Sequence, residues 1–113
     1  MSKESYIERK SVEYTFKTYD AICLKLTTQK GLPDRQFLYR GKSLFVEFKK
    51  PDGVDKTLQA WWCNRLNDRG FDAIPRVDNI VAFKQLFDLW VVHVNETSRQ
   101  TDKAVHQRGL ETI

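Results

Sequence analysis

The stretch Ser43-Leu-Phe-Val-Glu-Phe-Lys49 decides the fold of this chain. Alternate residues of a strand share a face, so Glu47 and Lys49 point away from the face that carries Leu44, Val46 and Phe48. An apolar strand that sets a carboxylate beside an ammonium calls for an explanation. Taken alone, Glu-x-Lys most often indicates a surface ion pair worth at most about 1 kcal/mol. The sequence context around it favours a functional site instead.

That context is Asp34, which follows Pro33 and stands 13 positions before Glu47. A tight turn predicted at Gly41-Lys42 joins strands 35–40 and 43–49 into a hairpin. Counting back from the turn, Asp34 and Glu47 can sit across from each other at one end of the hairpin. Two close carboxylates repel each other, and a divalent cation relieves that repulsion. The pair therefore predicts a site for Mg²⁺ or Mn²⁺.

Lys49 points at the same spot and completes a minimal set for phosphodiester hydrolysis. Its ammonium can hold the attacking water and offset the negative charge of the transition state. A metal, a water and a positive neighbour are what this reaction needs. Asp34, Glu47 and Lys49 are therefore the predicted catalytic residues.

The rest of the chain predicts an α/β domain with a mixed sheet, because the elements follow the order α-β-β-β-α-β-α. The domain is expected to span residues 1–95, and 96–113 to form a polar tail that is frayed or holds a short extra helix. The first helix is capped by Ser2 or Ser5 and the third by Asp78. The remaining elements are helices at 4–19, 55–68 and 78–95, a strand at 21–27, and a strand at 71–74 that is broken by Pro75.

Two helices carry apolar stripes that each allow two interpretations. In the second helix Leu58, Trp61, Trp62 and Leu66 predict a core face, although the tryptophans could instead stack on a base. The third helix is either buried on two sides or carries a dimer contact. Its stripe comprises Ile80, Phe83, Phe87, Trp90, Val91 and Val94, widened by Leu86 and Leu89.

Positive charge is concentrated in the middle of the chain. The 113 residues carry a net charge of +4 with a pI near 9.1, whereas residues 25–50 alone hold seven basic and two acidic side chains, a net of +5. This distribution fits a polyanionic partner, with a solvated basic face as the alternative. The seven are Lys25, Lys30, Arg35, Arg40, Lys42, Lys49 and Lys50.

Several classes of protein are excluded or disfavoured. Apolar runs such as 89–92 do not exceed four residues, too few to cross a membrane. Cys23 and Cys63 are too few for a zinc cluster or a disulfide scaffold, which favours a reduced, cytoplasmic setting. An apolar signal stretch is not seen, so export is not expected. A glycine-rich phosphate loop is not seen either, so a nucleotide cofactor is not expected.

The residues resemble a known pattern. Pro33-Asp34 followed by Glu47-x-Lys49 resembles the PD-(D/E)xK nuclease superfamily. The stretches Gly31–Arg35, Phe45–Pro51 and Leu58-Gln59 narrow this to the virus-type replication–repair nuclease (VRR-NUC) domain, over residues 8–81. The resemblance implies a single restriction-endonuclease-like domain with an additional C-terminal helix.

The resemblance also implies further site residues. The family carries a glutamate on its first helix, for which Glu8 fits best, ahead of Glu13 and Glu4. It places a glutamine where Gln59 stands, although an ordinary surface residue is the alternative there. The carbonyl of Phe48, which replaces the family's usual leucine, would bind the metal together with Asp34 and Glu47. The residues expected to grip DNA phosphates are Lys25, Lys30, Arg35, Arg40, Lys42 and Lys50.

The chain is similar to the short stand-alone members typical of phages and bacteria. That similarity implies a structure-specific DNA endonuclease that resolves four-way (Holliday) junctions as a homodimer in the host cytoplasm, without a membrane or a nucleotide cofactor. One alternative is a flap or nicking nuclease with the same site. Others are a non-catalytic DNA-binding accessory protein of phage replication and a structural protein with a fortuitous Glu-x-Lys.

Overall fold

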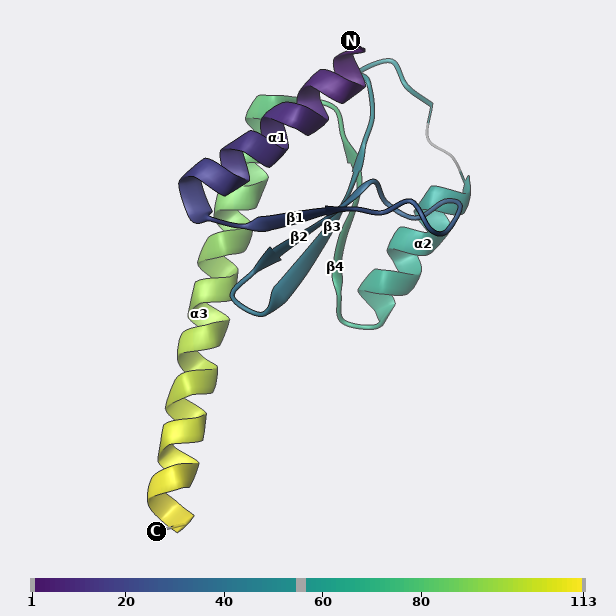
Figure 1. Ribbon diagram of the computed structural model, residues 1–113. Coiled ribbons are helices and arrows are strands. Elements are labelled where there is room, and N and C mark those ends of the chain that lie inside the picture. The colour runs from purple at the N-terminus through teal and green to yellow at the C-terminus, as the bar shows by residue number, and fades with distance from the viewer. Residues whose placement is uncertain (1, 55–56, 113) are drawn as a thin grey trace.

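The computed structural model describes residues 2–54 and 57–112, with side chains as far as Arg99 (Figure 1). The order of its elements confirms the predicted α-β-β-β-α-β-α succession. Ser2 caps the first helix, since its hydroxyl accepts a hydrogen bond from the Ser5 amide at 3.1 Å. The elements are α1 (Lys3–Tyr19), β1 (Ile22–Lys25), β2 (Arg35–Tyr39), β3 (Lys42–Phe48), α2 (Thr57–Asp68), β4 (Asp72–Val77) and α3 (Ile80–Thr112).

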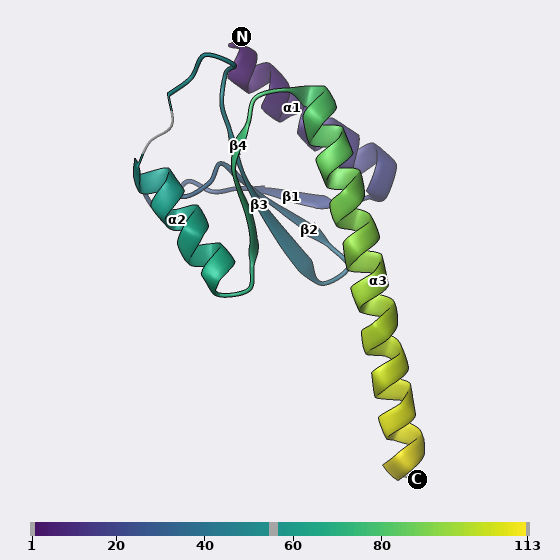
Figure 2. The same cartoon turned by 180° about the vertical axis from the view of Figure 1, so that it is seen from behind.

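The four strands form one mixed sheet in the order β1-β2-β3-β4. The first three strands are antiparallel neighbours, and β4 joins β3 in parallel after the crossover through α2. Figures 1 and 2 show α1 and α3 on one side of the sheet and α2 on the other. The mixed α/β architecture is therefore as predicted.

The β2–β3 turn lies one residue earlier than predicted. Arg40 and Gly41 occupy it with φ of 48° and 78°, the backbone that a two-residue hairpin turn requires at both positions. In the resulting register Arg35 pairs with Val46. The next position along each strand brings Asp34 and Glu47 opposite each other, as the sequence predicted.

The core lies between the sheet and the pair α1 and α3. Aromatic side chains of β2, β3 and α3 fill it, with Phe37, Phe48, Phe83 and Phe87 fully buried. Neighbouring ring centroids of this group lie 5.5–5.9 Å apart. This packing fixes the direction of β3 and hence of the side chains on its opposite face.

We expect Phe87→Ala to destabilise the fold by about 3–5 kcal/mol, because the change leaves a cavity among packed rings. Phe87 is fully buried and lies 5.3 Å, centroid to centroid, from Trp90. Leu89→Ala on the same helix is the control, since Leu89 is 71% exposed. Urea titration followed by circular dichroism gives both values, and equal midpoints for the two variants would contradict this account of the core.

The helix predicted to end near Asn95 continues to Thr112 as part of α3. Figures 1 and 2 show its C-terminal half extending past the sheet. Leu86 packs against the core whereas Leu89 is exposed, so α3 is not buried on two sides here. Across the described residues, helices of the length and apolarity needed to span a bilayer are not found.

Three local predictions are corrected. Asn79 rather than Asp78 caps α3, since its side-chain oxygen accepts the Ala82 amide at 3.0 Å. The strand after α2 does not stop at Pro75, because β4 is an edge strand with a bulge there and needs no amide at that position. In α2 the predicted core residues Leu58 and Trp61 are 42% and 47% exposed.

Candidate active site

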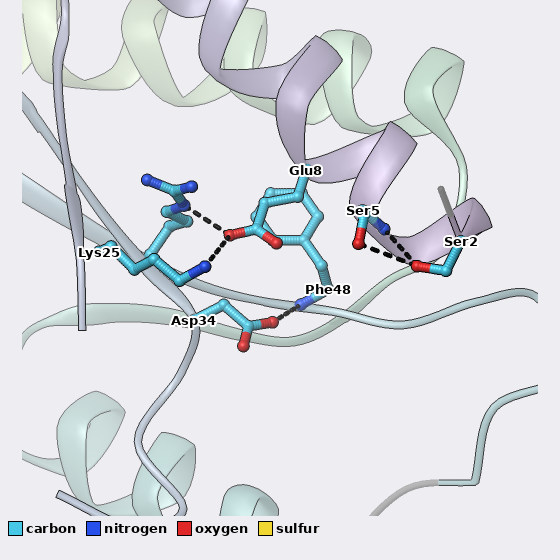
Figure 3. Close-up of polar contacts among 7 residues, drawn as sticks. Ser2, Ser5, Glu8, Lys25, Asp34 and Phe48 are labelled. Atoms are coloured by element: carbon cyan, nitrogen blue, oxygen red, sulfur yellow. Dashed lines mark hydrogen bonds and ion pairs between the residues drawn. The ribbon is translucent and has the colours of Figure 1, made fainter. Parts of the chain in front are cut away.

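The acidic pair lies at the open end of the β2–β3 hairpin, where β3 pairs with the bulge of β4. Glu47 belongs to β3 and is 1% exposed, and the half-buried Asp34 immediately precedes β2. The Asp34 carboxylate accepts a hydrogen bond from the backbone amide of Phe48 at 2.8 Å, as Figure 3 shows. Asp34 is thereby held against the segment that carries Glu47.

The surroundings of Glu47 disfavour its ionised form. Burial, followed by the negative charge of Asp34, raises the pKa of the Glu47 carboxyl to about 7, although Lys49 opposes the shift. Among the described residues, no hydrogen-bond partner reaches the buried Oε1 atom of Glu47. A buried carboxylate oxygen left open beside a second carboxylate is what a cation-binding site provides before the cation binds.

Lys49 lies on the same side of β3 as Glu47, as strand alternation predicted. Its ammonium nitrogen is 3.1 Å from Glu47 Oε2 and donates to Gln59 Oε1 of α2 at 2.5 Å. The residue is only 7% exposed. Gln59, expected at this place by resemblance, thus contacts the predicted catalytic lysine directly.

Glu8 reaches the region from α1 but is held by cations. Arg35 donates to Glu8 Oε1 at 2.6 Å, and the Lys25 ammonium lies 4.0 Å from the same atom. Figure 3 shows Glu8 pointing from α1 toward Lys25, while Asp34 turns to Phe48. Across the described residues, no group of three or more His, Cys, Asp or Glu side chains is placed to hold a metal. The structure thus brings Asp34 and Glu47 together and engages Glu8 elsewhere.

Comparison with known proteins finds a likeness among solved structures. Neither a protein-family model nor a curated protein sequence matches this chain. A solved structure described as "VRR_NUC domain" is similar to it with a TM-score of 0.69 and 23% identity, covering 78% of this chain and 97% of that one. This chain has the VRR_NUC fold. At this level of identity the likeness concerns the fold, which agrees with the architecture that the sequence predicted.

Within the VRR_NUC fold, the predicted DNA-binding residues fall into two groups. The exposed Lys25 and the half-buried Arg35 adjoin Glu8. Arg40 and Lys42 lie at the β2–β3 turn, the opposite end of the hairpin from Asp34, and Arg40 donates to Asn95 of α3 at 3.0 Å. The exposed Lys50 follows the strand that carries the site, and the exposed Lys30 lies in the β1–β2 loop. The basic segment therefore spreads over both ends of the hairpin.

Sequence reasoning missed two residues that the VRR_NUC fold brings to the site. Cys63 of α2 is buried close enough for the charge of Glu47 to help raise its thiol pKa to about 11, after burial as the main cause. Arg76 of β4 donates to backbone carbonyls of the turn that follows Lys49. No local pattern marks either residue, because both contacts depend on how β4 and α2 pack.

Proposed function

We propose that this protein is a divalent-metal-dependent DNA endonuclease. The supporting observation is the buried Glu47 carboxylate, which has one open oxygen and lies beside Asp34 and Lys49. Such an arrangement is costly for folding alone, because a buried charge with an unsatisfied oxygen destabilises a protein. Metal-assisted hydrolysis of a phosphodiester would give Glu47, Asp34 and Lys49 each a task. The VRR_NUC fold supports the same reading.

The donor set fits Mg²⁺ or Mn²⁺. Both ions prefer oxygen ligands, and Mg²⁺ is typically held by one or two carboxylates together with waters and phosphate oxygens. Asp34 and Glu47 would supply the carboxylates and the carbonyl of Phe48 a third protein ligand. When bound, the cation would neutralise the acidic pair and lower the pKa of a coordinated water. The Phe48 amide keeps the Asp34 carboxylate in place before the cation arrives.

Lys49 and Gln59 have separate tasks in the proposed reaction. Lys49 would stabilise negative charge on the phosphate during attack, which is where a preorganised ammonium in a dry site has its largest effect. Gln59 accepts from that ammonium and so fixes its direction. Glu8, held by Arg35 and Lys25, would position these two cations to contact a DNA phosphate.

We infer that the substrate is branched DNA and that the protein acts as a homodimer. A single domain offers one such site, whereas resolving a four-way junction needs two symmetric cuts, which a two-fold dimer supplies. The outward side of α3 presents Val81, Leu89 and Val92 at 61%, 71% and 53% exposure. This apolar surface is the candidate interface, and it favours a dimeric resolvase over a monomeric flap or nicking nuclease.

The test is incubation of the purified protein with four-way, flap, nicked and linear duplex DNA of matched length. Each substrate is offered with Mg²⁺, with Mn²⁺ and with EDTA, and products are resolved on denaturing gels. We expect metal-dependent, paired cuts in the four-way substrate and a dimer mass by light scattering. Preferential cutting of the flap or nicked substrate would favour that alternative nuclease. DNA binding without cleavage under all conditions would instead indicate an accessory protein and overturn the proposal.

A further inference from the structure

A bulge in β4 lies directly opposite the buried carboxylate of β3. Between Val46 and Phe48 the register of β3 against β4 slips by one residue. As a result two residues of β4, Pro75 and Arg76, stand opposite Glu47. Bulges re-aim side chains and are over-represented beside active sites. This one presents a guanidinium to the segment that leaves the proposed catalytic strand.

The Arg76 guanidinium donates hydrogen bonds to the backbone of the turn formed by residues 50–53. Its Nε donates to a carboxylate oxygen of Asp78 at 3.0 Å, which fixes the plane of the group. The remaining nitrogens donate to three carbonyl oxygens of the turn, those of Gly53 at 2.9 Å, Pro51 at 3.1 Å and Lys50 at 3.4 Å.

The same turn lies beside the base of the Lys49 side chain. A Cβ added to Gly53 would lie 3.6 Å from the Cβ of Lys49 and 3.1 Å from the Lys50 carbonyl oxygen, so this close approach suits glycine. The Gly53 amide closes the turn by donating to that carbonyl at 2.9 Å. The turn thus directly follows and adjoins a lysine that ends in a charge yet is only 7% exposed.

We propose that Arg76 is a positioning residue for the proposed reaction: by fixing the turn at 50–53, it holds the Lys49 ammonium between Glu47 and Gln59. The inference rests on the proposed function, because it assigns Arg76 a role in that same site. Arginine suits the task because its planar fork donates in several fixed directions at once, whereas a lysine ammonium cannot span three separated carbonyls and a carboxylate.

The test compares Arg76→Ala and Arg76→Lys with a control, Arg69→Ala. Arg69 is exposed and donates to the Arg65 carbonyl one turn earlier at 3.2 Å. We expect Arg76→Ala to lower kcat about 10–100-fold with KM for DNA changed less than about twofold, since small misplacements of a catalytic group carry costs of this order. Arg76→Lys should recover part of the loss. Arg69→Ala should retain wild-type kcat.

A second readout needs neither metal nor DNA. Hydrogen exchange of the Gly53 amide, followed by NMR, reports directly on the bond that closes the turn. We expect exchange to accelerate at least tenfold in both Arg76 variants, while buried amides of β3 keep wild-type rates. If Arg76→Ala fails to fold in a thermal melt, Arg76→Lys provides the same comparison.

The outcomes separate the two proposals. A wild-type kcat in both Arg76 variants, or unchanged Gly53 exchange, overturns the role of Arg76 while leaving the nuclease proposal intact. Absence of cleavage by the wild-type protein on every DNA substrate overturns the proposed function. In that case accelerated Gly53 exchange would support the fixing of the turn by Arg76, and unchanged exchange would overturn it as well.

Discussion

Lys49→Ala is expected to lower the rate of DNA cleavage by about 10³-fold while DNA affinity changes less than about threefold. Lys49 is buried beside Glu47 and bonded to Gln59, so in the proposed reaction it would act on the phosphate rather than attract DNA from solution. Removal of one preorganised electrostatic group typically costs 10²–10³-fold in kcat, and loss of help to the attacking water adds to this.

The measurement is single-turnover cleavage of the preferred DNA substrate at saturating Mn²⁺, with affinity taken from anisotropy in EDTA. Lys17→Ala provides the matched control, because Lys17 is exposed in the last turn of α1 and away from the acidic pair. Thermal melts exclude unfolding as the cause. Equal single-turnover rates for Lys49→Ala and Lys17→Ala would show that the lysine has no part in the chemistry.

The acidic pair could be predicted from the sequence because its geometry is set locally. A two-residue turn fixes the register of a hairpin, and the register in turn fixes which residues face each other. A turn at Gly41-Lys42 would set Asp34 opposite Lys49, whereas the structure's turn, one residue earlier at Arg40 and Gly41, pairs Arg35 with Val46 and so sets Asp34 opposite Glu47. The alternation of β3 then places Lys49 beside Glu47.

Other features depend on packing between elements distant in the sequence. The spacing of Leu58 and Trp61 predicted a core face of α2, but the helix turns Cys63 inward and leaves both exposed. Apolar spacing indicates which side of a helix is apolar. It does not indicate how much of that side the neighbouring sheet buries. The C-terminal end of α3 was predicted too early, also because apolar spacing was the only guide. Residues 96–112 are polar and carry little periodicity, so the pattern gave no sign that the helix continues.

Arg76 shows why the support of a site is harder to predict than the site itself. Its position directly after Pro75 suggested a broken strand, and nothing in that dipeptide indicates a bulge. Asp78, expected as a helix cap, is paired with Arg76 while Asn79 takes over the cap. The partners of Arg76 in the turn at 50–53 lie more than 20 positions away in the sequence, so no local pattern predicts them.

Glu47→Gln is expected to abolish both metal binding and cleavage and to remove a pH dependence of stability. The folded-state pKa of Glu47 is raised to about 7 from an ordinary 4.5, so the folded protein binds this proton more tightly than the unfolded chain does. The stabilisation is therefore present below about pH 4.5 and is lost as pH rises through about 7, by on the order of 3 kcal/mol at most.

Metal-free wild-type protein should accordingly melt at progressively lower temperature between pH 5 and pH 8, whereas Glu47→Gln should show a markedly flatter profile. Because Mg²⁺ or Mn²⁺ requires the ionised carboxylate, its stabilising shift in Tm should grow over the same range in the wild type and be absent in the variant. Glu96→Gln, an exposed change on α3, should follow the wild type in both respects. Scanning fluorimetry with and without metal provides all of these values. Parallel pH profiles for wild type and Glu47→Gln would mean that Glu47 does not carry the shifted proton, and the case for a cation held by Glu47 and Asp34 would then lose its electrostatic basis.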